Sequence, residues 1–185
     1  LILFGPPGSG KTTLAEVIAA TTKAVFVPMS AISAGKADIM NVVHEAEERL
    51  RFYGKKTILF IDEIHRFNKS QQDALLGAVE DGTIVLIGAT TENPSFEVIR
   101  PLLSRCQVFV LKSLERTELE RLLDRALKED EILKHRKIEV KETDALFRHS
   151  AGDARKLLNI LEIVVGSFTG NKDVVIDNKT VTSCL

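Results

Sequence analysis

The first fifteen residues constrain this chain more than any other stretch, because a short apolar run leads into a glycine-rich turn and a lysine. Gly5, Gly10, Lys11 and Thr12 have the spacing G-x4-G-K-[ST] of a phosphate-binding loop. Glycines are needed there because a Cβ would collide with the phosphates or because φ must be positive. A helix that starts near Gly10 directs its positive end at the anion. The stretch therefore predicts a strand, a nucleotide-phosphate loop and a helix.

The residues of the loop are predicted to have separate tasks. The Lys11 ammonium is expected to reach the β- and γ-phosphates, and the Thr12 hydroxyl is expected to bind Mg²⁺. The rest of the loop is expected to surround the phosphates with backbone N–H groups. The predicted nucleotide-binding residues are Gly5, Pro6, Pro7, Gly8, Ser9, Gly10, Lys11, Thr12 and Thr13.

A second motif is an apolar run at residues 58–61 that ends in Asp62 and Glu63, as in a Walker B strand. In a parallel sheet its carboxyl end faces the same crevice as the phosphate-binding loop. Asp62 is expected to hold Mg²⁺ together with Thr12, through water. Glu63 is then placed to orient or deprotonate the water that attacks the γ-phosphate. The two motifs together predict Mg²⁺-dependent hydrolysis of a nucleotide.

A third candidate follows another strand-like run, where residues 86–93 end in small polar side chains. If this strand lies between the two motif strands, one of these side chains can hydrogen-bond the γ-phosphate or the water. Thr90 is the first choice, and Thr91 and Asn93 remain alternatives. An ordinary turn after a strand is the competing interpretation.

Strand-like and helix-like patterns alternate through residues 1–112, which predicts a doubly wound parallel sheet with helices on both faces, the α/β fold of P-loop NTPases. Residues 113–169 have only helical periodicity and predict a small all-helical subdomain. The polar segment 170–185 is interpreted as a connector. Besides the strand before the glycine-rich turn, the expected strands are 24–28, 57–61, 83–88 and 107–111. The expected helices are 11–20, 37–53, 70–79, a short one between Pro94 and Pro101, 115–129, 142–150 and 153–165.

Composition excludes several other classes of protein. The net charge is −1, so no global basic field indicates nucleic acid, and only a local basic patch is left as an alternative. The two cysteines have no metal-ligand spacing, which favours a reducing cytosol over a disulfide framework. No apolar run is long enough to span a membrane. The histidines have no ligand spacing and are interpreted as ordinary polar residues: His44, His65, His135 and His149.

The order of these motifs, followed by Ser-Arg-Cys around Arg105 and Gly-Asp-Ala-Arg ending at Arg155, resembles AAA+ ATPases of the clamp-loader branch. Residues 57–73 and 88–96 are more specific. They are similar to the MgsA/RarA replication-associated recombination ATPases, whose eukaryotic relative is the Werner helicase-interacting protein. The resemblance extends to about Ser167. Without it, Arg105 and Arg155 would be interpreted as surface arginines.

The resemblance implies ATP as the nucleotide, hydrolysed at subunit interfaces beneath a helical lid. It implies that Arg105 is an arginine finger offered to a neighbouring subunit and that Arg155 is the sensor-2 arginine of the lid. Thr90 falls on the sensor-1 position, where clamp loaders usually carry Asn. The implied catalytic set is Lys11, Glu63, Thr90, Arg105 and Arg155.

The resemblance also implies partners. Family members act at stalled replication forks, bind DNA junctions and ends and the single-strand DNA-binding protein, and assemble as tetramers in the bacterial cytoplasm. The segment that holds adenine is expected before Leu1, and the oligomerisation region is expected beyond Leu185. A nucleotide-gated loader or binding subunit with little turnover remains the alternative function. A P-loop kinase is disfavoured by Glu63 beside Asp62 and by the helical lid.

Overall fold

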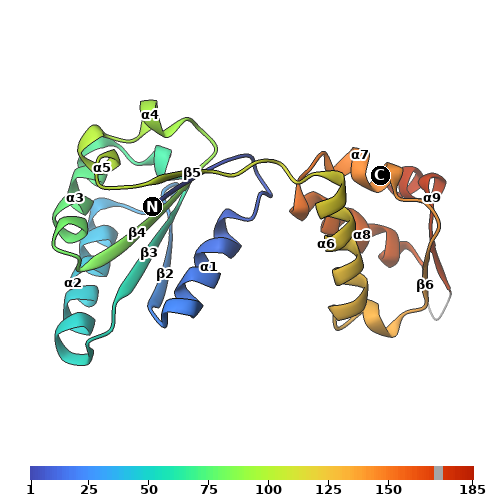
Figure 1. The fold of residues 1–185 in the computed structure, drawn as a ribbon, viewed down its shortest axis with the longest axis horizontal. Coiled ribbons are helices and arrows are strands. Elements are labelled where there is room, and N and C mark those ends of the chain that lie inside the picture. The colour runs from blue at the N-terminus through green and yellow to red at the C-terminus, as the bar shows by residue number, and fades with distance from the viewer. Residues whose placement is uncertain (169–172) are drawn as a thin grey trace. The chain divides into compact units, whose positions relative to one another are not determined.

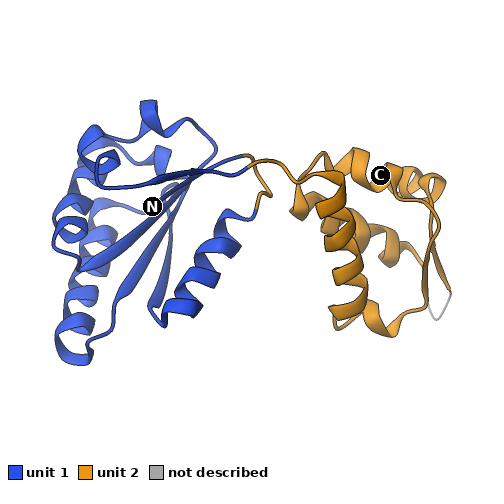
Figure 2. Ribbon diagram, viewed as in Figure 1, with its two compact units in different colours: residues 1–5, 10–111 blue, residues 6–9, 112–185 orange. Residues whose placement is uncertain are grey.

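The computed structural model describes residues 1–168 and 173–185. The described chain forms two compact units (Figures 1 and 2). Unit 1 consists of residues 1–5 and 10–111, and unit 2 consists of residues 6–9 and 112–185. Across the described residues, no helix combines the length and the hydropathy that a membrane span requires.

Unit 1 is built on one five-stranded sheet in the order β2-β3-β4-β1-β5, and every strand pair is parallel. β4 therefore lies between β1, which leads into the glycine-rich loop, and β3, which ends in the acidic pair. This confirms the predicted parallel α/β fold. The strands are β1 (Ile2–Phe4), β2 (Val25–Ser30), β3 (Thr57–Asp62), β4 (Ile84–Thr90) and β5 (Val108–Val110).

Helices cover both faces of this sheet (Figure 1). Successive side chains of β3 point to opposite faces, so Ile58 and Phe60 pack with the face that α1 covers, whereas Leu59 and Ile61 pack with α2 and α3. Burial on both faces explains why β3 is continuously apolar. The helices are α1 (Lys11–Thr22), α2 (Lys36–Tyr53), η1 (Ile64–Arg66), α3 (Lys69–Glu80), α4 (Pro94–Glu97) and α5 (Arg100–Leu103).

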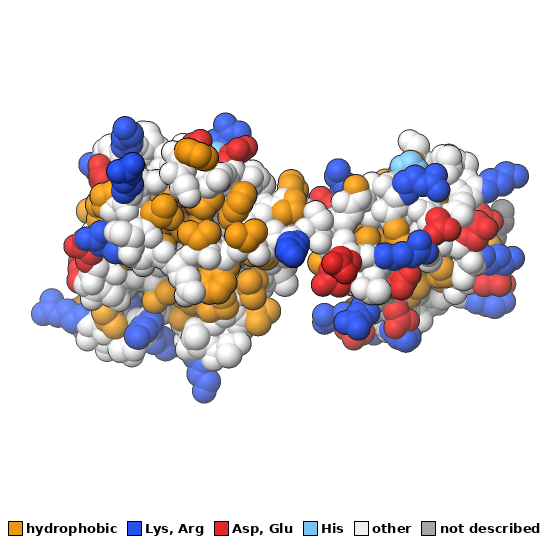
Figure 3. Space-filling view, turned by 45° about the horizontal axis from the view of Figure 1, so that its top comes forward, with side chains coloured by type: hydrophobic (Ala, Val, Ile, Leu, Met, Phe, Trp, Pro, Cys, Tyr) orange, Lys and Arg blue, Asp and Glu red, His pale blue; other side chains and the backbone are white. Residues whose placement is uncertain are grey.

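The two edge strands of the sheet differ in character. β2 carries Pro28, which has no N–H to offer along an edge. β5 has three consecutive exposed apolar residues, Val108, Phe109 and Val110. In the space-filling view, hydrophobic side chains gather in a broad patch on unit 1, whereas charged side chains of both signs stand out on unit 2 (Figure 3).

Unit 2 has its own apolar core and is mainly helical, but the prediction of an all-helical subdomain over 113–169 was wrong. A two-stranded parallel sheet pairs Ile138–Val140 with Val174–Ile176. The elements of unit 2 are α6 (Arg116–Glu129), η2 (Leu133–His135), β6 (Ile138–Val140), α7 (Asp144–Ser150), α8 (Ala154–Ser167), β7 (Val174–Ile176) and α9 (Asn178–Cys184).

The interpretation of residues 170–185 as a connector was also wrong for the part that the structure describes. Val174, Ile176 and Val181 are completely buried in the core of unit 2. Asp177, one of the polar residues that suggested a linker, is the N-cap of α9 and accepts a hydrogen bond from the Thr180 N–H. Residues 170–172 lie outside the described residues.

Candidate nucleotide-binding site

Gly5 follows β1 and opens the glycine-rich loop. Its N–H donates to the Thr90 carbonyl at 3.1 Å, which ties the start of the loop to the end of β4. A Cβ at Gly5 would lie 2.5 Å from the Leu111 carbonyl oxygen. Glycine is therefore required here because another backbone segment packs behind the loop, and not because φ is positive.

Lys11 begins α1 and is buried, with only 8% of its surface exposed. Its Nζ donates to the Gly5 carbonyl oxygen at 2.8 Å, so the ammonium is folded back into the loop. Gly10 precedes it in the left-handed region at φ 86°, a conformation that favours glycine. A buried cation at a helix N-terminus is the environment that an anionic phosphate requires. The residues present therefore fit the predicted phosphate site.

The tip of the loop, residues 6–9, belongs to unit 2 (Figure 2). The Gly8 carbonyl accepts a hydrogen bond from the Ala154 N–H at 3.3 Å. A Cβ at Gly8 would lie 1.8 Å from Oδ1 of Asp153, the N-cap of α8. Arg155 lies in the first turn of this helix, so the start of α8 and the loop tip are in direct contact within unit 2.

Asp62 ends β3, and Glu63 turns the chain away from the sheet. Glu63 has φ 54° and ψ 44°, the left-handed region that non-glycine residues rarely adopt. The Glu63 N–H donates to Oδ1 of Asp62 at 3.2 Å. The turn gives the two neighbouring carboxylates different surroundings, which suits the separate roles predicted for them.

His65 is a site residue that the sequence interpretation missed. It lies in η1, and its side chain is only 8% exposed. Its Nδ1 lies 3.2 Å from Oε2 of Glu63 and 3.0 Å from Oγ1 of Thr90. The histidines have no metal-ligand spacing in the sequence, so this criterion did not identify His65. The available signal was its position in the tight turn directly after the acidic pair.

The three candidates at the end of β4 have different surroundings. Thr90 is completely buried, and its hydroxyl bonds both the N–H and the carbonyl of Glu92, at 2.9 and 3.2 Å. Asn93 is the N-cap of α4 and accepts the Ser95 N–H. Thr91 is half-buried, and its Oγ1 lies 3.5 Å from Oε2 of Glu63. This geometry favours Thr91 over Thr90 as the residue that meets a ligand.

Arg105 lies between α5 and β5, with 39% of its side chain exposed. Its guanidinium forms an ion pair with Glu80 of α3 and donates to the Pro101 carbonyl at 2.6 Å. Arg105 is thus held at the surface of unit 1 and remains accessible to another molecule.

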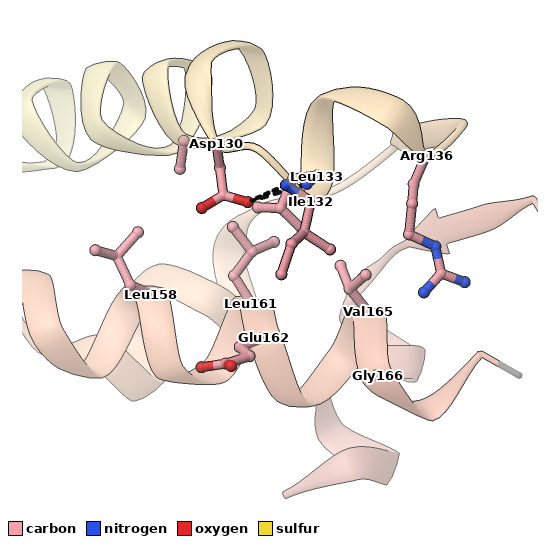
Figure 4. A pocket seen from close by; sticks show the side chains of 10 residues that line it. Asp130, Ile132, Leu133, Arg136, Leu158, Leu161, Glu162, Val165 and Gly166 are labelled. Atoms are coloured by element: carbon pink, nitrogen blue, oxygen red, sulfur yellow. Dashed lines mark hydrogen bonds between the residues drawn. The ribbon is translucent and has the colours of Figure 1, made fainter.

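Unit 2 also contains a cavity of about 320 Å³ that is unrelated to these residues (Figure 4). Leu158, Leu161 and Val165 of α8 face Ile132 of the segment after α6. Asp130 is engaged with the Leu133 and Ile132 N–H groups, and these bonds hold the pKa of its carboxyl below the ordinary value. The lining is mainly apolar, and its charged residues are the acids Asp130 and Glu162 and the base Arg136, a mixture that does not favour a phosphate.

Residues 1–114 match the family described as "ATPase family associated with various cellular activities (AAA)". The chain is 52% identical to Replication-associated recombination protein A of Coxiella burnetii, over 89% of this chain and 37% of that protein. It is 49% identical to ATPase WRNIP1 of Dictyostelium discoideum, over 89% of this chain and 19% of that protein. The predicted resemblance is confirmed, and the chain spans well under half the length of these relatives.

A solved structure with a similar fold is the Thermotoga maritima RuvB Holliday junction branch migration motor. The TM-score is 0.79 and the identity 29%, over 99% of this chain and 59% of that one. The likeness covers both units.

Proposed function

Since this chain belongs to the AAA family of ATPases, we propose that it hydrolyses ATP as part of a larger protein that maintains replicating or recombining DNA. The observation that supports hydrolysis best is the group of polar side chains at the carboxyl ends of β3 and β4. Glu63 lies there beside Asp62, with Thr91 and His65 against its carboxylate. A subunit that only binds nucleotide has no need of a positioned carboxylate.

In this proposal the loop N–H groups and Lys11 bind the triphosphate, and Glu63 orients or deprotonates the attacking water. Thr12 and Asp62 supply the hydroxyl and carboxylate oxygens that suit Mg²⁺. The ion would neutralise charge on the phosphates. Arg155 acts as the sensor-2 arginine, which is supported by the contact of its helix with the loop tip within unit 2.

The proposal includes assembly, with Arg105 of one subunit completing the site of its neighbour in a homo-oligomer. Its exposure supports this role. DNA forks, junctions or ends are the proposed substrates, and the single-strand DNA-binding protein is a proposed partner. The names of the relatives support DNA as the substrate.

The test is the ATPase rate of the full-length protein that contains this chain, measured with and without forked or single-strand-ended DNA. The Glu63→Gln variant should bind ATP with wild-type affinity and hydrolyse it at least about 100-fold more slowly, the scale on which a positioned base acts. Glu16→Gln, an exposed change on α1, is the matched control and should leave the rate unchanged.

The outcomes separate the alternatives. Hydrolysis by Glu63→Gln at the wild-type rate would remove Glu63 from the mechanism. Wild-type protein that binds ATP but turns it over negligibly, with every DNA tested, would favour the nucleotide-gated loader or binding subunit. Hydrolysis that no DNA stimulates would contradict the role on DNA and leave the ATPase proposal intact.

A further inference from the structure

His65 is nearly buried beside the candidate catalytic carboxylate, although the proposed hydrolysis assigns it no task. It lies two residues after Glu63, in the single turn of η1. Its Nδ1 is within hydrogen-bonding distance of both Glu63 Oε2 and Thr90 Oγ1, at 3.2 and 3.0 Å. A ring nitrogen either donates or accepts a hydrogen bond, and the bonds of its neighbours indicate which.

The Thr90 hydroxyl has one proton to donate and two lone pairs. Its Oγ1 accepts the Glu92 N–H at 2.9 Å and donates to the Glu92 carbonyl at 3.2 Å. The proton is thereby used, and one lone pair remains for His65. With the hydroxyl proton directed at the Glu92 carbonyl, the 3.0 Å contact with His65 is a hydrogen bond only if Nδ1 carries a hydrogen.

The Glu63 carboxylate requires the same assignment. An ionised carboxylate only accepts hydrogen bonds, so an unprotonated Nδ1 at 3.2 Å would place two lone pairs against each other. With the hydrogen on Nδ1, this one N–H is shared between Thr90 Oγ1 and Oε2 of Glu63, and the Thr91 hydroxyl approaches the same Glu63 oxygen at 3.5 Å. One oxygen of the carboxylate is thus held, and the other remains available.

The backbone of Glu63 is also in a rarely populated conformation. A non-glycine residue at φ 54° is in a conformation that persists only where the surroundings enforce it. The Glu63 side chain is 28% exposed, so packing encloses only part of it. The closest side-chain donor to its carboxylate among the described residues is the ring of His65, which is itself nearly buried and fixed by Thr90.

We propose that His65 is a positioning residue, whose Nδ1–H fixes the orientation in which the Glu63 carboxylate meets the attacking water. This inference rests on the proposed ATP hydrolysis. His65 acts through Glu63 and has no contact with the nucleotide in this proposal. A misplacement of about 1 Å can cost about 100-fold in rate, so loss of the donor should appear in kcat.

The first experiment is independent of turnover. Long-range ¹H–¹⁵N spectra of the histidine rings of the full-length protein report which nitrogen carries the hydrogen, and the His65→Asn variant identifies the His65 signals. Nδ1 of His65 should be protonated, and Glu63→Gln should shift its resonance. A neutral ring with its hydrogen only on Nε2 would overturn the proposal, whether or not the protein hydrolyses ATP.

The second experiment compares His65→Leu and His65→Asn in steady-state hydrolysis. Leucine fills similar space without a donor, whereas the asparagine amide can place an N–H near the position of Nδ1. His65→Leu should lower kcat about 10- to 100-fold with KM for ATP unchanged, and His65→Asn should recover most of that loss. His44→Leu, a change at a highly exposed histidine of α2, is the matched control and should leave kcat unchanged.

The possible kinetic outcomes are all informative. Equal losses in the two His65 variants indicate a packing role and overturn the proposal, as does a rise in KM without a fall in kcat. A kcat that stays constant or rises in His65→Leu also overturns it. Wild-type protein without any hydrolysis contradicts the proposed function instead, and the ring spectra then decide whether the His65–Glu63 bond exists.

Discussion

Gly88 offers a test of how closely the sheet supports the candidate catalytic turn. It lies in β4 between Ile2 of β1 and Ile61 of β3. A Cβ there would lie 2.8 Å from Cδ1 of Ile64 and 2.9 Å from Cδ1 of Ile2. Both isoleucines are completely buried, so neither methyl group has free space to move into. Ile64 follows Glu63 directly, so the perturbation reaches the acidic turn.

The expected cost of Gly88→Ala is about 1–3 kcal/mol of unfolding free energy, the usual range for one extra methyl group in a packed core. Ile64→Val removes the closest atom and should alone cost about 0.5–1.5 kcal/mol. In the double variant the two changes relieve each other, so its cost should be at least about 0.5 kcal/mol below the sum of the single costs. Gly77→Ala in α3, where nothing lies within 4 Å, should instead stabilise by about 0.5–1 kcal/mol.

Guanidinium denaturation of the four variants measures these differences, and thermal melting offers a check because 1 kcal/mol corresponds to roughly 2–4 °C at this size. Gly88→Ala should also lower kcat, since Ile64 connects Glu63 to His65. If the unfolding free-energy costs of Gly88→Ala and Ile64→Val were strictly additive in the double variant, the contact between the new methyl group and Ile64 would be refuted. A Gly88→Ala variant as stable as Gly77→Ala would refute the packing argument entirely.

Three further predictions concern other parts of the chain. Lys11→Ala removes a charged hydrogen-bond donor worth about 1.5–3 kcal/mol, so calorimetry should show ATP affinity falling roughly 10- to 150-fold, and unchanged affinity would contradict its role. Arg105→Ala should abolish hydrolysis, and mixing with Lys11→Ala subunits should restore part of it, whereas absence of rescue would argue against action on a neighbour. Backbone hydrogen bonds from Thr180 and Leu133 hold the pKa values of Asp177 and Asp130 below the ordinary 3.8. The stability they contribute is therefore present above about pH 4 and lost as pH falls through the lowered pKa. Asp177→Asn should narrow the difference between denaturation midpoints at pH 7 and pH 3, and an unchanged difference would contradict this assignment.

In unit 1, the sequence predicts those features for which the local pattern of apolar and polar residues also determines their place in the sheet. β3 is apolar because both of its faces are covered, and the polar residues that follow it are confined to the carboxyl edge of the sheet. The same rule places Thr90 between the two motif strands. Local pattern could not choose between Thr90 and Thr91, because that choice depends on which hydroxyl the following turn engages.

His65 and the small sheet of unit 2 were not predictable for a related reason. The placement of His65 beside Glu63 comes from a left-handed turn, and no periodicity reveals such a turn. β6 and β7 are three residues each, and they pair across the whole of α7 and α8. Segments that short become strands through their partner, so only the tertiary structure identifies them.

The unequal edges of the sheet bear on how this chain behaves at high concentration. An unpaired edge strand is a template for another strand, and Pro28 blunts that tendency on β2. On β5 no proline or charge interrupts Val108, Phe109 and Val110. Any β-type aggregation of the isolated chain should therefore begin at β5. Charged substitutions meant to suppress such aggregation should be placed on that strand.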